Sequence, residues 1–204
     1  MGAKLSRFYD SRYGWSKEVI FLPVLINGVL EGYIKAGLKK EKDRPSYINA
    51  KGPWSKSHGL FPYDYAVNLM NSLNSSTMFL VEGPRDALRL LALGIPAMSI
   101  LGTQAWSELK IKVLSLAPID QIVLMLDGDD AGIQATEKIE PTLQPYFQEV
   151  QVVKLWKYKQ SPYQLFADCE FPSKAAKEAG VNLWDPCSCP IVIINKLKKI
   201  YFED

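Results

Sequence analysis

The feature that most restricts the fold of this chain is a regular alternation of short apolar runs with longer amphipathic segments between residues 77 and 155. The apolar runs predict strands at 78–81, 97–101, 122–126 and 150–155. The amphipathic segments predict helices at 86–93, 108–116 and 132–146, the last broken or kinked at Pro141. Apolar strands joined by crossover helices are typical of a parallel sheet covered by helices on both faces. We therefore predict an α/β fold with a doubly wound, Rossmann-like core.

A different pattern precedes this core. Two apolar stretches at 19–26 and 29–38 are separated by Asn27-Gly28, and an Asn-Gly pair between apolar runs is a strong signal of a β-hairpin. A short helix is predicted near residues 63–73, and a polar loop at 71–77 divides the chain. We therefore expect three parts. They are a small, mixed and β-rich basic subdomain over residues 1–75, the α/β core over 76–158 and a C-terminal extension over 159–204.

Composition excludes several classes of protein. The 24 lysine and arginine residues nearly balance the 22 aspartate and glutamate residues, so any contact with nucleic acid must come from local patches. The three cysteines form no CxxC pair and the single histidine is distant, which excludes a zinc ribbon. An odd number of cysteines without a signal peptide favours the cytoplasm. No stretch has the roughly 20 apolar residues that a membrane span needs, so we expect no membrane contact.

Acidic residues follow two of the predicted strands. Glu82 comes directly after the strand at 78–81, and Asp86 lies four residues further on. Asp127 and Asp129 follow the strand at 122–126, and Asp130 is predicted to cap the next helix. Ligands of open α/β sheets gather beyond the carboxyl ends of the strands. If the two strands are neighbours, these carboxylates meet at one edge of the sheet.

A cluster of anions of this kind is best explained by a bound cation, because the carboxylates would otherwise repel one another and raise their own pKa values. Oxygen ligands without histidine or thiolate select Mg²⁺ or Mn²⁺. Simpler explanations stay open, since an Asp-Gly pair often forms only a turn and Asp86 suits the first turn of a helix. A calcium loop is excluded because Ala131 and Lys138 occupy positions that require oxygen ligands.

The spacing of these acids resembles the Toprim signature, which primases share with type IA and type II topoisomerases and certain nucleases. The stretches VEGPRDALRLLALGIPAMSILGT at 81–103 and IVLMLDGDDAG at 122–132 most resemble bacterial DnaG-type and phage DNA primases. Upstream, VIFLPVLINGVLEGYIKA at 19–36 and RPSYINAKGPWSKSHGLFPYDYA at 44–66 are similar to the basic subdomain of the same primases. The order of the two regions favours a primase over a topoisomerase.

The resemblance implies metal-dependent synthesis of short RNA primers on single-stranded DNA from nucleoside triphosphates. It implies a metal bound by Glu82, Asp86, Asp127 and Asp129. It also implies basic residues on the opposite wall that hold template or triphosphate, namely Lys35, Arg44, Lys51 and Lys56. Lys56 would join Glu82, Asp127 and Asp129 as a catalytic residue. A replicative helicase or a separate template-reading subunit would be a partner, in the cytoplasm of a bacterial or phage-infected cell.

Two alternatives and one departure accompany this prediction. A Toprim nuclease would use the same acids to activate water, and a degenerate Toprim module would bind nucleic acid without turnover. Aromatic residues such as Tyr47, Trp54, Phe61 and Tyr63 would then stack on bases. Where the family carries a further acidic pair after the strand at 150–155, this sequence has Ser161 and Tyr163, so we expect fewer metal ligands. The tail with WDPCSC resembles no known motif and is expected to be a packing or docking element.

Overall fold

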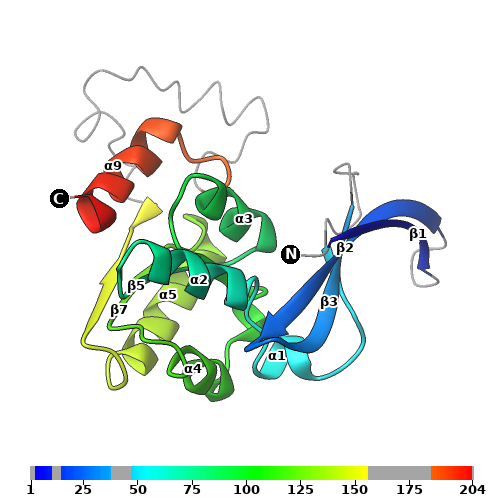
Figure 1. The fold of residues 1–204 in the computed structure, drawn as a ribbon, viewed down its shortest axis with the longest axis horizontal. Helices are drawn as coiled ribbons and strands as arrows, with labels where there is room; N and C mark the ends of the chain where they lie inside the picture. The colour runs from blue at the N-terminus through cyan, green and yellow to red at the C-terminus, as the bar shows by residue number, and fades with distance from the viewer. Residues whose placement is uncertain (1–2, 11–14, 38–46, 156–184, 204) are drawn as a thin grey trace.

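The structure is a computed structural model that describes residues 3–10, 15–37, 47–155 and 185–203. Within these ranges the chain forms two four-stranded sheets. The first is antiparallel and projects from one side of the second, which is parallel and surrounded by helices (Figure 1). The predicted α/β class, with a helix-covered parallel sheet preceded by a β-rich part, is confirmed.

The antiparallel sheet has the order β1-β2-β3-β4. Its strands are β1 (Lys4–Asp10), β2 (Trp15–Ile26), β3 (Val29–Gly37) and β4 (Tyr47–Asn49). The predicted hairpin joins β2 to β3, and both turn residues are left-handed, with φ of 50° at Asn27 and 78° at Gly28. The carboxylate of Asp64 accepts hydrogen bonds from the backbone N–H groups of both turn residues, at 2.6 and 2.8 Å. The hairpin is therefore anchored to the helical part of the chain.

The parallel sheet has the order β6-β5-β7-β8. Its strands are β5 (Thr77–Val81), β6 (Ala97–Ser99), β7 (Gln121–Leu124) and β8 (Glu149–Val152). Helices α3 (Pro84–Ala92), α4 (Glu108–Leu114) and α5 (Asp130–Leu143) connect successive strands. These elements match the predicted alternation. Every residue of β5 is buried, as expected for a strand with helices on both sides.

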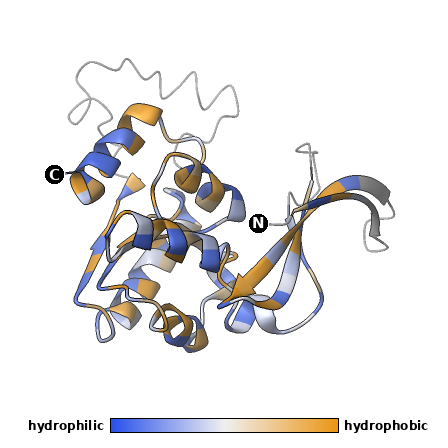
Figure 2. Cartoon of the chain, in the orientation of Figure 1, coloured by the Kyte–Doolittle hydropathy of each residue, from blue (hydrophilic) through white to orange (hydrophobic). Residues whose placement is uncertain are grey.

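The residues of β5 alternate between two hydrophobic clusters. Met78 and Leu80 pack in the cluster that includes α2 (Tyr63–Ser72), α4 and α5. Phe79 and Val81 pack in the other cluster, with α3 and α9 (Ile191–Phe202). Figure 2 shows that α9 carries both apolar and hydrophilic residues, as expected of a helix with one face on a core. Residues 191–202 are therefore a packing element of the parallel sheet.

A third cluster joins the antiparallel sheet to the rest of the chain around Trp54, in the short helix α1 (Trp54–Ser57). The indole is only 5% exposed. A Cβ atom at Gly32 would lie 2.4 Å from the ring, and one at Gly59 would lie 2.7 Å from it. Because only glycine allows this close approach, β3 and the chain after α1 close tightly on the indole. Trp54, Phe61 and Tyr63 are core residues and do not offer rings for stacking on bases.

Two local predictions about α5 are corrected. Asp130 does not cap the helix, because Asp129 is the N-cap residue and its Oδ1 accepts a hydrogen bond from the backbone N–H of Gly132 at 2.9 Å. The helix starts at Asp130, whose side chain is exposed. The expected break is also absent, since α5 continues through Pro141 to Leu143. Of the helices within the described ranges, none combines the length and apolar character needed to cross a membrane.

Candidate metal centre and nucleic-acid interface

Strands β5 and β7 are hydrogen-bonded neighbours and run in parallel, so their carboxyl ends lie at the same edge of the sheet. Glu82, Asp86 and Asp127 come from the segments that leave this edge. All three line a cavity of about 570 Å³. The structure therefore brings together three of the four predicted metal ligands in one cavity.

Among these acids, Asp127 has the largest shift in pKa. Its Oδ1 atom is buried and has no hydrogen-bond partner among the residues that the structure describes. Burial raises the pKa of this carboxyl to about 8, and the neighbouring Asp86 and Glu82 add to the shift. A buried anionic oxygen without a donor, surrounded by further carboxylates, fits the coordination of a divalent cation.

Asp86 has two structural bonds in addition to its place in the cavity. Its Oδ2 accepts a hydrogen bond from the backbone N–H of Gly83 at 3.0 Å, which caps the start of α3. Its Oδ1 accepts a hydrogen bond from the backbone N–H of Cys187 at 3.1 Å. Burial and then the nearby Asp185 raise the pKa of Asp86 to about 6. A carboxylate has about four lone-pair positions, so these two bonds leave room for a cation.

Asp129 lies near Glu82 but does not line the cavity. Asp129 is exposed, and its carboxylate caps the N-terminus of α5. It lies close enough to Glu82 to add to the effect of burial, and both raise the pKa of the Glu82 carboxyl. Gly132 holds this loop against the helix, because a Cβ atom there would lie 2.0 Å from the backbone oxygen of Asp127.

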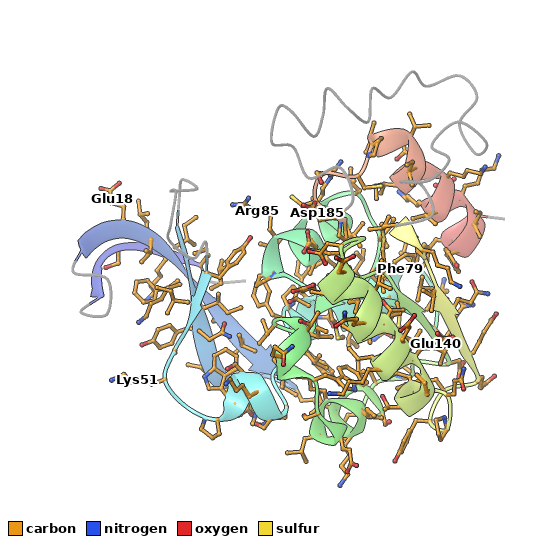
Figure 3. All side chains as sticks on the ribbon, turned by 180° about the vertical axis from the view of Figure 1, so that it is seen from behind. Glu18, Lys51, Phe79, Arg85, Glu140 and Asp185 are labelled. Atoms are coloured by element: carbon orange, nitrogen blue, oxygen red, sulfur yellow. The ribbon has the colours of Figure 1, made fainter. Side chains whose placement is uncertain are left out.

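Sequence reasoning missed a contribution from the end of the chain. Asp185 and Cys187 line the same cavity. One carboxylate oxygen each of Asp86 and Asp185 and the Sγ atom of Cys187 lie within 4.8 Å of one another. Burial raises the pKa of the Cys187 thiol. Figure 3 labels Asp185 at the edge of the parallel sheet where the acids gather.

The segment that carries these two residues is held against α3. The Arg89 guanidinium donates hydrogen bonds to the backbone oxygens of Pro186, at 3.4 Å, and Cys189, at 2.6 Å. Ser161 and Tyr163, the positions where further acids were expected, lie outside the described residues. The one available signal was the Asp185-Pro186 pair just before an apolar segment, well after Ser161 and Tyr163, where the resemblance places the acids.

Of the predicted basic residues that the structure describes, Lys56 shares a cavity with an acid. It lines a second cavity, of about 270 Å³, together with Glu82 and Asn49. The two cavities share four lining residues, which are Asn49, Glu82, Leu101 and Gly102. Lys56 therefore lies beside the acidic cluster.

The other predicted basic residues are placed differently. Lys51 is exposed, and Figure 3 shows its side chain pointing away from the parallel sheet. Lys35 pairs with Ile48 across the sheet and thus lies on the face opposite Asn49, which lines both cavities. Arg44 lies outside the described residues.

Lys110 in α4 fixes the position of the Lys56 segment. Its side chain is fully buried, and its Nζ donates hydrogen bonds to the backbone oxygens of Ser55 at 2.9 Å and Gly59 at 2.5 Å. These carbonyls lie on either side of Lys56 in the sequence. Burial lowers the pKa of Lys110 to about 7. A sequence prediction could not identify this residue, since a helical lysine is usually solvated.

His58 ties the same segment to the antiparallel sheet. Its Nε2 and the Oε2 of Glu31 on β3 are 2.8 Å apart, and its Nδ1 is 2.8 Å from the Oγ of Ser57. The histidine is therefore a structural connection between the two parts of the chain.

A second cation faces the first cavity. Arg85 is exposed at its edge, with its guanidinium carbon 5.9 Å from the centre of the Tyr47 ring. The hydroxyl of Tyr47 is buried without a hydrogen-bond partner among the described residues, and burial raises its pKa to about 12. Figure 3 shows Arg85 between the antiparallel sheet and Asp185.

Comparison with known proteins agrees with this geometry. Residues 79–161 match the family described as Toprim-like. A DNA primase from Myxococcus xanthus is 31% identical over 101 residues, which is 48% of this chain and 16% of that primase. The chain therefore spans about a sixth of the length of this curated relative.

Solved structures show the same fold. A structure of the Aquifex aeolicus primase, with its zinc-binding and RNA polymerase domains, has a TM-score of 0.56 at 24% identity over 79% of this chain and 42% of that one. A DNA primase domain from Pseudomonas aeruginosa has a TM-score of 0.51 at 25% identity over 72% of this chain and 48% of that one. This chain contains a Toprim-like domain, and its fold resembles that of bacterial DNA primases.

Proposed function

We propose that this chain carries out metal-dependent, template-directed synthesis of short RNA primers on single-stranded DNA. One observation carries the proposal: the acidic cavity at the carboxyl ends of β5 and β7 adjoins the cavity that contains Lys56. Anionic ligands for a cation and a cation for phosphate oxygens therefore lie side by side. Nucleotidyl transfer needs both kinds of group.

Glu82, Asp86, Asp127 and Asp185 would hold Mg²⁺ or Mn²⁺, with Asp129 at the edge of the site. The bound ion would lower the pKa of the attacking 3′ hydroxyl and offset negative charge on the triphosphate. The unpartnered Oδ1 of Asp127 supports this placement.

The basic residues would act on phosphate groups. Lys56 is exposed and free to reach a triphosphate beside Glu82, while Lys110 holds its backbone in place. Arg85 would contact phosphate at the other end of the acidic cavity. Lys35, Arg44 and Lys51 would contribute to binding of the template, which should weaken as salt concentration rises. The expected partners are single-stranded DNA, nucleoside triphosphates and a replicative helicase or template-reading subunit.

Incorporation of labelled ribonucleotides on a mixed-sequence single-stranded template, with Mg²⁺ or Mn²⁺, tests the proposal. We expect short products from the native chain and none from Asp127→Asn. Asp130→Asn is the matched control, because Asp130 is an exposed acid at the start of α5, three residues after Asp127, and does not line the cavity.

Two other outcomes would overturn the proposal. Cleavage of the labelled strand without incorporation would indicate a Toprim nuclease that uses the same acids. Binding of single-stranded DNA without incorporation or cleavage, by native chain and Asp127→Asn alike, would indicate a binding module without turnover.

A further inference from the structure

The acidic cavity contains one potential ligand that is not an oxygen. The Sγ atom of Cys187 and one carboxylate oxygen from each of Asp86 and Asp185 lie within 4.8 Å of one another. The three residues come from two segments about 100 positions apart in the sequence. Their convergence therefore depends on tertiary contacts.

Those contacts hold the thiol at the cavity. The backbone N–H of Cys187 donates to Asp86, and Arg89 donates to the carbonyls of Pro186 and Cys189 on either side. The turn is closed internally, since the backbone N–H and the hydroxyl of Ser188 both donate to Asp185 Oδ1, at 2.5 and 2.7 Å. The backbone of the segment is thus fixed on both sides of the thiol.

We propose that Cys187, Asp86 and Asp185 form a mixed sulfur and oxygen ligand set that favours a thiophilic divalent cation such as Zn²⁺ over Mg²⁺. The proposal rests on the proposed function, because it concerns the cation of the same cavity. Thiolate selects softer ions, whereas Mg²⁺ takes octahedral oxygen ligands and keeps several waters.

The distances are compatible with such an ion. Zinc binds sulfur at about 2.3 Å and carboxylate oxygen at about 2.0–2.2 Å in a tetrahedral arrangement, so its ligand atoms are about 3.5 Å apart. The three atoms lie within 4.8 Å of one another, so binding requires the side chains to approach by up to about 1 Å. Asp127 offers a further ligand atom, because its buried Oδ1 has no hydrogen-bond partner among the described residues and Asp127 lines the same cavity.

Titration of the full chain with Cd²⁺ tests the thiol directly, because a cadmium–thiolate bond gives a charge-transfer band in the ultraviolet. We expect the band in the native chain and in Cys189→Ser. We expect Cys187→Ser to lose the band and at least about tenfold in affinity for Cd²⁺. Cys189 is the matched control, since its side chain is buried in the hydrophobic cluster under α9. A band of equal strength in Cys187→Ser would overturn the proposal.

Thermal unfolding with Cd²⁺ or Mg²⁺ separates this proposal from the proposed function and also reports whether each variant folds. Cys187→Asp replaces the thiol by a carboxylate, so we expect it to gain stabilisation by Mg²⁺ and to lose stabilisation by Cd²⁺. If Mg²⁺ stabilises the native chain but not Asp127→Asn, and Cd²⁺ acts independently of Cys187, the thiol proposal fails while the acidic site stands. If neither ion stabilises the native chain, both proposals fail.

Discussion

The two walls of the candidate site are built in different ways. On the acidic wall, Asp86 and Asp127 are held at the edge of the parallel sheet, largely out of contact with water, and burial raises their pKa values. On the basic wall, Lys56 is exposed on a segment that packs between the two sheets. The acids are thus positioned by the fold itself, whereas the Lys56 side chain extends into solvent, where it can follow a ligand.

This difference has an energetic meaning. A buried carboxylate oxygen without a donor, such as Asp127 Oδ1, destabilises the folded chain until a cation binds, so the acidic wall is arranged for a ligand at the expense of stability. Exposed lysines have little effect on stability, and each adds to binding mainly by releasing counterions from phosphate. Replacing an acid of the acidic wall should therefore change both activity and the stability of the metal-free chain, whereas replacing an exposed lysine should change activity or binding and leave stability unchanged.

Asp127→Asn should give the largest effect. We expect nucleotide incorporation to fall by about 10³-fold, because several kcal/mol of transition-state stabilisation by a bound metal ion would be lost. We also expect the metal-free variant to unfold at a higher temperature than the native chain, because a buried unpaired carboxylate is replaced by a neutral amide. Incorporation assays and thermal unfolding without divalent ions check both effects. A lower unfolding temperature would contradict the inference that the buried carboxylate of Asp127 destabilises the metal-free chain.

Lys56→Ala should lower incorporation by about 10²-fold and leave the unfolding temperature unchanged, because an exposed cation aimed at phosphate is removed. Lys51→Ala is the matched control on the same segment. It should lower affinity for single-stranded DNA only slightly and reduce the salt dependence of binding by about one counterion. Equal losses of incorporation in the two variants would show that Lys56 has no special position beside Glu82.

Lys110→Met should destabilise the chain by about 2 kcal/mol, since the carbonyls of Ser55 and Gly59 would lose their donor. For a chain of this size, that is a fall of about 4–8 °C in unfolding temperature. Because the Lys56 segment would be less well positioned, incorporation should fall as well. Lys112→Met, at an exposed position in the same helix, should change neither quantity. If Lys110→Met lost stability but kept incorporation, the bonds from Lys110 would stabilise the fold without positioning Lys56.

The pH dependence of stability should give the sharpest comparison of the two walls. The pKa values of Asp86, about 6, and Asp127, about 8, exceed the usual value of about 4 for an unfolded chain. The folded state therefore binds more protons between pH 4 and 8, and the free energy of unfolding should fall as pH rises through this window. Divalent cations should reverse the trend, because they favour the ionised carboxylates.

Asp127→Asn provides the control for this measurement. It should lose the upper part of the slope, between about pH 6 and 8, and keep the lower part that belongs to Asp86. Lys110, with a pKa lowered to about 7, adds a slope of opposite sign above neutral pH in both proteins. Chemical denaturation at several pH values would reveal the difference. If the free energy of unfolding depended on pH in the same way in both proteins, the pKa of Asp127 would not be raised in the folded state.

Much of the fold was predictable from the sequence because its signals are local. The strands, the helices and the hairpin at Asn27-Gly28 follow from apolar periodicity and turn chemistry within a few residues. The meeting of Glu82 with Asp127 also follows, since both come directly after neighbouring parallel strands.

The unpredicted parts depend on distant contacts or on near-equivalent residues. Asp185 and Cys187 reach the site through bonds to Asp86 and Arg89, about 100 positions away, which leave no periodic trace in the sequence. The helix cap was placed on Asp130 instead of Asp129, because two adjacent aspartates have the same capping chemistry and only the backbone path distinguishes them.

The contact of α3 with the segment at 185–189 also has a consequence for how the protein matures. Chains are synthesised from the N-terminus, and contacts between residues far apart in sequence are slow to form. The sheet and its first three acids are complete once residue 155 has emerged, but the turn that contributes Asp185 arrives much later. Helix α9, which covers one face of the sheet, arrives later still. A nascent chain would therefore become competent to bind its cation only after the turn at 185–189 has packed against α3.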